Sequence, residues 1–229
     1  MEPMSHFCLV PGAGGAGWYF HRVVPLLEGA GHTVVAVDLP ADDPDAGLPE
    51  YVEIALSACA YEDDVVVVGQ SLGAFTALMT ADRLMQANRP PRALVLLNAM
   101  VPLPGETPGA WWGAVGQGAA MRAAAEAGGW SPEYDDHTYF LHDISPELVA
   151  AGEEHQRPEA DVVFGSVCDV AAYPTVPTRV LAGADDRFFP LALEQRLARE
   201  RVGVEVEVLP GGHLLSLSQP DALAAALLG

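Results

Sequence analysis

The sequence contains no lysine, and its 11 basic residues are all arginines, set against 31 aspartates and glutamates. The formal net charge of −20 at pH 7 repels phosphate backbones and anionic lipid, so we expect binding neither to nucleic acid nor to a membrane surface. Strongly anionic substrates are disfavoured too, unless a local arginine counteracts the field. The simplest interpretation of the acidity is that it keeps the protein in solution.

Cysteine is scarce as well. Cys8, Cys59 and Cys168 are widely separated and form no Cys-x-x-Cys pair, which predicts buried thiols in a reducing compartment. A zinc site would need other ligands, and we expect no metal. No apolar run is long enough to span a bilayer, and the N-terminus lacks the basic region of a signal peptide. These absences predict a cytoplasmic protein.

Half of the residues in the chain are hydrophobic, and strand-like and helix-like segments alternate regularly along it. Buried apolar strands that alternate with helices predict an α/β fold, a mostly parallel, doubly wound sheet with helices on both faces. The expected strands are 6–10, 33–37, 65–68, 93–97, 179–182 and 205–209. The expected helices are 18–29, 49–60, 72–88, 191–201 and 221–228.

Residues 101–175 interrupt this alternation. The segment is rich in proline, glycine, tryptophan and tyrosine and contains helix-like stretches but no convincing strand. We interpret 1–229 as a single domain in which this helical insertion lies over the carboxyl edge of the sheet and roofs a pocket. Trp111, Trp112 and Tyr139 are candidates for its aromatic wall, although packing of the insertion onto the core would also explain such residues.

The glycine-rich segment Gly12–Gly17 satisfies G-x-G-x-x-G after a strand and before a helix. Asp38 follows about 20 residues later, at the end of the next strand, where a ribose-binding acid is expected. By spacing alone this predicts a dinucleotide site and an NAD(P)-dependent oxidoreductase. Against it, short-chain reductases need a Tyr-x-x-x-Lys pair, which a chain without lysine cannot supply.

A second motif, Gly69-Gln70-Ser71-Leu72-Gly73, stands directly between a buried strand and a helix. In that context G-x-S-x-G predicts a nucleophile elbow, a sharp turn that holds the serine at strained backbone angles with its hydroxyl exposed. The N-terminus of the following helix directs free N–H groups and a positive dipole end towards developing negative charge. A chance glycine-rich turn is the alternative.

A serine nucleophile needs a histidine base and an acid that orients it, and in this fold they follow in the order serine, acid, histidine. His213 is the only histidine after residue 175, and it follows a strand in Gly211-Gly212-His213. Asp185 and Asp186 follow the preceding strand in the same way. Each candidate therefore lies on a loop at the carboxyl edge, where the three can converge.

These segments together resemble the α/β-hydrolase family. More narrowly, they resemble the branch that contains plant methylesterases, hydroxynitrile lyases and bacterial relatives. The matching segments are 6–13, 17–18, 25–32, 37–39, 69–73, 185–190 and 211–213, so the likeness covers the chain outside the insertion. The family pattern of glycine, two residues, aspartate, three residues and proline selects Asp186 as the acid, with Asp185 as the alternative.

The resemblance also gives the glycine-rich loop another role. It implies that the backbone N–H groups of Ala13 and Leu72 form an oxyanion hole, with Gly12 close to the substrate. Met100, just after a strand, is a further candidate for the pocket wall. Relatives usually have histidine where this chain has Pro11, which has no N–H and stiffens the loop but leaves Ala13 free to donate.

We therefore expect a serine esterase that cleaves a small, largely apolar ester through an acyl-enzyme on Ser71, without a metal or organic cofactor. The lyases of this branch use a threonine in the first loop and a lysine after the histidine, where this chain has Gly12 and Leu214. That disfavours cyanohydrin cleavage, but other lyase, acyltransferase or natural-product tailoring activities remain alternatives. The oligomeric state, monomer or dimer, is left open by the sequence.

Overall fold

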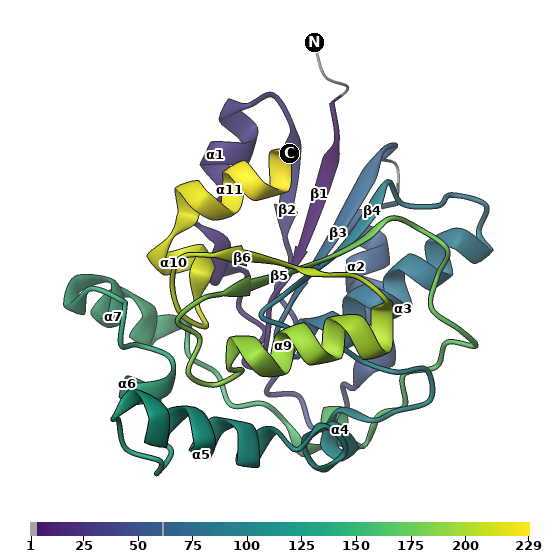
Figure 1. Ribbon diagram of the computed structural model, residues 1–229. Coiled ribbons are helices and arrows are strands. Elements are labelled where there is room, and N and C mark those ends of the chain that lie inside the picture. Colours follow the sequence, from purple (N-terminus) through teal and green to yellow (C-terminus); the bar gives the residue numbers. More distant parts are fainter. Residues whose placement is uncertain (1–3, 61) are drawn as a thin grey trace.

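The six predicted strands form one sheet with the order β2-β1-β3-β4-β5-β6 (Figure 1). The computed structural model describes residues 4–60 and 62–229. The strands are β1 (His6–Val10), β2 (Thr33–Ala36), β3 (Val65–Gln70), β4 (Ala93–Leu97), β5 (Thr178–Gly183) and β6 (Val206–Leu209). Every pairing between neighbouring strands is parallel.

Two layers of helices cover the sheet because successive side chains of a strand point to opposite faces. In β3, Val65 and Val67 belong to one buried apolar cluster, and Val66 and Val68 to the other. The first cluster includes residues of α2 (Leu48–Ala58), α3 (Gly73–Gln86) and α9 (Leu191–Leu197). The second includes residues of α1 (Val24–Gly29), α10 (Leu215–Ser218) and α11 (Pro220–Leu228).

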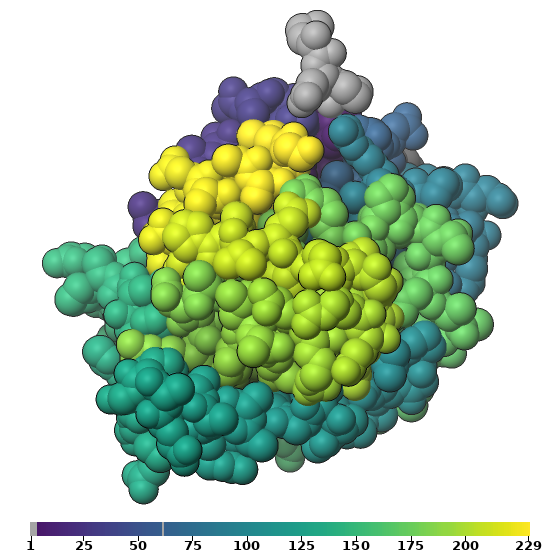
Figure 2. Space-filling view, viewed as in Figure 1, coloured from purple at the N-terminus to yellow at the C-terminus, as the bar shows by residue number. Residues whose placement is uncertain are grey.

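Residues 98–177, all of which the structure describes, form helices and loops and contribute no strand. The helices are α4 (Pro108–Val115), α5 (Gln117–Gly128), α6 (Asp136–Tyr139), α7 (Pro146–Gly152) and α8 (Asp161–Gly165). In Figure 1, α4 to α7 gather at the end of the sheet opposite the two chain termini. In Figure 2 the teal residues of this segment cover that end of the molecule. We call residues 101–175 the cap.

Two of the expected helices are less regular than their apolar spacing predicted. The expected helix 18–29 is divided into the 3-10 helix η1 (Gly17–Phe20) and α1, which begins at Val24 with Pro25 in its first turn. Proline lacks the N–H that a continuous helix would use and clashes with the carbonyl of the preceding turn, so a new helix begins there. The expected helix 191–201 widens after Leu197 into a π-type turn, Ala198–Val202.

The strand order places a crevice between β1 and β3. From β1 the chain runs outward to β2 on one side and then crosses back to β3 on the other, so β1 and β3 flank the point where the order reverses. In open parallel sheets ligands bind at such a point, beyond the carboxyl ends of the strands. The glycine-rich loop follows β1 and the G-x-S-x-G turn follows β3, so both motifs meet at this crevice.

Candidate active site

Ser71 lies in a tight turn between β3 and α3, at a φ of 53°. A non-glycine residue in this left-handed region is strained, and such strain is concentrated at functional sites. The Ser71 N–H donates to the Leu97 carbonyl at 3.0 Å, and the Ser71 carbonyl accepts from the Met100 N–H at 3.1 Å. A Cβ on Gly69 would meet Ala77 at 2.6 Å, and one on Gly73 would overlap the Pro11 carbonyl, so both glycines are needed for this packing.

The imidazole of His213 lies between Ser71 and Asp186. Its Nδ1 is 2.8 Å from Asp186 Oδ2, and its Nε2 is 3.1 Å from Ser71 Oγ. An ionised carboxylate only accepts hydrogen bonds, so Nδ1–H is the donor in the neutral ring and Nε2 is left to accept from the serine hydroxyl. The three side chains, which come from loops after β3, β5 and β6, therefore form one hydrogen-bonded chain.

Asp186 rather than Asp185 is the carboxylate that contacts the histidine. It is buried, and its Oδ1 accepts from the backbone N–H groups of Phe188 at 2.8 Å and Phe189 at 2.9 Å. Its two oxygens therefore have separate tasks, because one holds the loop and the other holds His213. Asp185 is exposed.

The two predicted oxyanion-hole residues face the same cavity as Ser71. Ala13 and Leu72 both line it. The neighbouring Gly12 N–H is occupied, since it donates to Gln70 Oε1 at 3.1 Å. Within residues 4–60 and 62–229, the Ala13 and Leu72 N–H groups have no hydrogen-bond partner, so they are available to an oxyanion.

A cavity of about 410 Å³ opens above Ser71 and His213, a volume in the usual range for small-molecule sites. Gly12, Met100 and Trp112, three of the predicted wall residues, line it. Tyr19 of η1 lines it as well. The rest of its aromatic wall is a set of rings that contact one another and come from both the cap and the acid loop: Trp112, Tyr134, Phe140 and Phe188.

The other two predicted wall residues, Trp111 and Tyr139, are placed elsewhere, which corrects that expectation. Both are fully buried and neither lines the cavity. The Trp111 indole N–H donates to the Val101 carbonyl at 3.1 Å, and the Tyr139 hydroxyl donates to the Ser131 carbonyl at 2.7 Å. Both bonds lie within the cap, and Trp111 also packs in the buried core cluster against Phe189, which is the packing role that the sequence left open.

A comparison with models of protein families identifies the family to which the chain belongs. A model described as the alpha/beta hydrolase family matches residues 9–226. The chain belongs to this family.

Individual relatives of this α/β-hydrolase differ in how much of it they match. A pyrethroid hydrolase from Sphingobium wenxiniae is 25% identical over 247 residues, which cover 98% of this chain and 86% of that protein. An alpha-hydroxynitrile lyase from Arabidopsis thaliana is 34% identical over 112 residues, 44% of this chain and only 42% of the lyase. The crystal structure of polyneuridine aldehyde esterase superimposes with a TM-score of 0.79 at 21% identity, covering 99% and 98% of the two chains, and shows the shared fold.

The glycine-rich loop of this α/β-hydrolase is closed by its own cap. Glu159 accepts the Gly14 N–H at 2.7 Å and also the Tyr51 hydroxyl at 2.6 Å. Asp38 accepts the Gly17 N–H at 2.9 Å, and an arginine of the cap donates to the Gly15 carbonyl at 3.1 Å. Carboxylates therefore occupy the amides that a cofactor pyrophosphate would need, which removes the basis for a dinucleotide site here.

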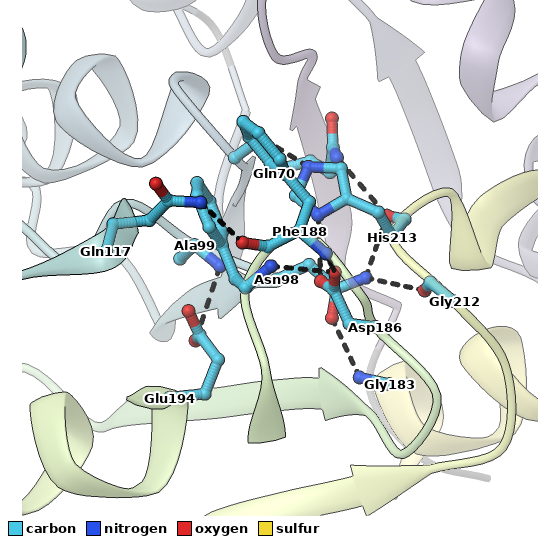
Figure 3. Close-up of polar contacts among 12 residues, drawn as sticks. Gln70, Asn98, Ala99, Gln117, Gly183, Asp186, Phe188, Glu194, Gly212 and His213 are labelled. Atoms are coloured by element: carbon cyan, nitrogen blue, oxygen red, sulfur yellow. Dashed lines mark hydrogen bonds and ion pairs between the residues drawn. The ribbon is translucent and has the colours of Figure 1, made fainter. Parts of the chain in front are cut away.

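Two polar residues that the sequence did not indicate hold together the loops around Ser71, Asp186 and His213 (Figure 3). Asn98, fully buried after β4, donates to the carbonyls of Gly212 at 3.0 Å and His213 at 2.8 Å, and accepts the Gly183 N–H at 2.7 Å. Gln70 accepts the Gly12 N–H and lies 3.5 Å from the His213 carbonyl. A polar residue next to a buried apolar strand was the available signal for both.

Glu194 is a fully buried carboxyl that lies beside Ala99 (Figure 3). Burial raises the pKa of Glu194 well above its ordinary value, and the negative charge of Asp186 adds to the rise. One oxygen accepts the Ala99 N–H at 3.4 Å; the other has no partner in the described part of the chain. Glu194 is therefore neutral in the folded protein over a pH range in which an exposed glutamate is charged, and it adds no second charge beside Asp186.

We expect Glu194→Gln to stabilise the protein more at high pH than at low pH. Above the unfolded-state pKa of about 4.3 the folded wild type binds one more proton than the unfolded chain, so its unfolding free energy falls by up to about 1.4 kcal/mol per pH unit until the folded pKa is passed. Glutamine does not titrate and avoids this loss. Urea unfolding at pH 5 and pH 8 measures it, with Glu200→Gln on the exposed surface as control. A stability difference between variant and wild type that is the same at both pH values contradicts the assignment.

Within residues 4–60 and 62–229 there is no cluster of three or more histidine, cysteine, aspartate or glutamate side chains placed to hold a metal ion. The same residues include no helix both long and apolar enough to cross a membrane.

Proposed function

We propose that this α/β-hydrolase is a serine esterase that cleaves small, largely apolar esters through an acyl-enzyme on Ser71. The observation that carries the proposal is the hydrogen-bonded chain from Ser71 through His213 to Asp186, at the floor of a cavity with two free backbone N–H groups. A nucleophile, an oriented base and oxyanion donors are the three components that acyl transfer requires. Hydrolases and esterases among the relatives are consistent with it.

In the first half-reaction His213 Nε2 takes the hydroxyl proton of Ser71 while Oγ attacks the ester carbonyl carbon. The carbonyl oxygen becomes an oxyanion, stabilised by the N–H groups of Ala13 and Leu72. The imidazolium, held through Nδ1 by Asp186, then gives its proton to the leaving alkoxide oxygen as the carbon–oxygen bond breaks. The alcohol departs and Ser71 carries the acyl group.

In the second half-reaction a water molecule replaces the alcohol. His213 takes a proton from it, the hydroxide attacks the acyl carbon, and the collapse of the second tetrahedral intermediate returns the proton to Ser71 Oγ and releases the acid.

The aromatic wall of Trp112, Tyr134, Phe140 and Phe188 gives the substrate an apolar environment. We propose that this wall, with Met100 and Gly12, selects uncharged esters of modest size.

Wild-type protein is expected to hydrolyse p-nitrophenyl acetate and butyrate and to react covalently with a fluorophosphonate probe at a single serine. Both reactions need an activated hydroxyl and an oxyanion hole but little substrate recognition, so they report on the catalytic groups directly. Release of p-nitrophenolate and mass spectrometry of the labelled peptide measure them, with heat-denatured protein as control. A folded protein that shows neither turnover nor labelling contradicts the proposal.

A second candidate is a lyase or acyltransferase on the same site, since a lyase is among the relatives. Gly12 and Leu214 both line the cavity, so neither position supplies the hydroxyl or ammonium group of the lyases that the sequence resembles. The same experiment separates the two, because probe labelling without ester turnover favours the non-hydrolytic alternative.

A further inference from the structure

Two side chains hold the loop that carries His213, one as a hydrogen-bond donor and the other as an acceptor. From the sheet, Asn98 donates to the carbonyls of Gly212 and His213. From the cap, Asp143 accepts the Gly212 N–H through Oδ2 at 2.7 Å. The backbone of Gly212 is therefore held on both sides: its N–H is bonded to the cap, and its C=O is bonded to the core of the fold.

The cap also contacts the loop that carries Asp186. Gln117 of α5, which is buried, donates to the Phe188 carbonyl at 2.7 Å. Arg187 donates to the Thr138 carbonyl at 3.3 Å, and its guanidinium lies 4.6 Å from the centre of the Trp130 ring. Both loops that place the base and the acid are thus bonded to cap residues.

These bonds matter because packing does not completely fill the space between the cap and the loop that carries Asp186. A second cavity of about 340 Å³ lies there, lined by residues of the acid loop and by His142 and Asp143 of the cap. An interior is normally close-packed, and packing then holds a backbone in place. Where an open cavity separates the cap from the acid loop, hydrogen bonds between the two contribute more to the position of the backbone.

The Asp143 side chain is half-buried, and its hydrogen bond to the Gly212 N–H is the one that its carboxylate forms in the described part of the chain. Its Oδ1 forms no hydrogen bond within residues 4–60 and 62–229, nor does Nε2 of His142 beside it. Both atoms face the Gly212 backbone, at 2.9 and 2.8 Å from where a Cβ on that glycine would lie. The bond to the Gly212 N–H is the specific interaction that this carboxylate makes with the active site.

We propose that Asp143 is a positioning residue for the base: through the Gly212 N–H it holds His213 at hydrogen-bond distance from Ser71, so that docking of the cap completes the catalytic geometry. The inference rests on the proposed function of Ser71, His213 and Asp186. His213 Nε2 and Ser71 Oγ are 3.1 Å apart, near the upper end of the range for an efficient proton transfer. A small shift of the loop away from Ser71 would lengthen this contact beyond that range.

The test compares Asp143→Ala, Asp143→Ser and Asp143→Asn with the wild type. Alanine cannot accept the Gly212 N–H and serine is too short to reach it, whereas the asparagine side-chain oxygen can. A displacement of about 1 Å can cost about 100-fold in rate, so alanine and serine should slow fluorophosphonate labelling of Ser71 and lower kcat by about 10- to 100-fold. KM for p-nitrophenyl butyrate should change by less than about threefold, and asparagine should stay within about threefold of wild type in every constant.

Asp169→Asn is the matched control. Asp169 is another cap carboxylate that contacts the core of the fold, through an exposed ion pair with Arg83 of α3 at 3.2 Å, and neither residue lines the cavity above Ser71. Such a pair contributes little to stability, so labelling, kcat and thermal unfolding should all equal those of wild type. The serine variant provides the same test if the alanine variant does not fold.

Three results would overturn the inference. If Asp143→Ala and Asp143→Ser label as fast as wild type and differ only in KM or thermal stability, Asp143 merely anchors the cap. If Asp143→Asn is as slow as Asp143→Ala, the charge and not the hydrogen bond is what matters. If the wild type itself does not label, the proposed function falls and the inference falls with it, so the two failures are distinguished by the wild-type rate.

Discussion

Ser71→Ala is expected to abolish fluorophosphonate labelling and to lower p-nitrophenyl ester turnover by about 10⁴- to 10⁶-fold. The alanine side chain has no atom that can form the acyl-enzyme, while the Ala13 and Leu72 N–H groups remain to stabilise an oxyanion formed by water. A small residual rate is therefore expected. The change removes only one oxygen atom from a side chain that faces the cavity, so the fold should be unaffected.

The appropriate control is Ser57→Ala. The Ser57 hydroxyl donates to the Glu53 carbonyl within α2 and is exposed, so its loss should change neither labelling nor turnover. Intact mass and thermal unfolding of both variants confirm that each is folded. If Ser71→Ala retained labelling at the wild-type rate, another residue would be the nucleophile and the elbow would have only a structural role.

The sequence was most informative where the residues that form a strand also decide where that strand lies in the sheet. The run Val65–Val68 is buried on both faces of the sheet, so its apolar continuity marked a central strand. Parallel strands bring their carboxyl ends to one edge, and the turns after β3, β5 and β6 therefore had to meet there. Convergence of Ser71, Asp186 and His213 follows from that topology without any knowledge of side-chain contacts.

Local spacing was ambiguous for the glycine-rich loop. Gly12–Gly17 has the spacing of a phosphate cradle, and the spacing alone does not reveal what occupies its N–H groups. In the structure Glu159 and Asp38 occupy two of them. Glu159 lies 145 residues from its partner Gly14 in the sequence, so the spacing of glycines within the motif cannot predict this contact.

The cap was the least predictable part, because its aromatic residues follow no regular spacing. Trp111 and Trp112 are neighbours on α4, yet the first is fully buried and the second lines the cavity. Adjacent residues on a helix point about 100° apart, so only the orientation of α4 on the core decides which of them meets the substrate. The supporting roles of Asn98 and Asp143 depend on the same tertiary placement.

Asp186→Asn is expected to lower kcat/KM by about 10⁴-fold while leaving the fold intact. The orientation of the new amide is decided by the loop. Asp186 Oδ1 accepts two backbone N–H groups, from Phe188 and Phe189, and only an oxygen can replace it there. The amide nitrogen must then occupy the Oδ2 position, 2.8 Å from His213 Nδ1 in the wild type.

An N–H group facing Nδ1 forces the imidazole into its other tautomer, with the proton on Nε2. In that tautomer His213 cannot accept the Ser71 proton, and a neutral amide does not stabilise the imidazolium. Asp185→Asn is the matched control, because Asp185 is adjacent in sequence but exposed, and should stay within about threefold of wild type. Measured kcat/KM and labelling rates for both variants decide the matter: if Asp185→Asn were the more damaging change, the acid would be Asp185, and Asp186 would only shape the loop through its two backbone hydrogen bonds.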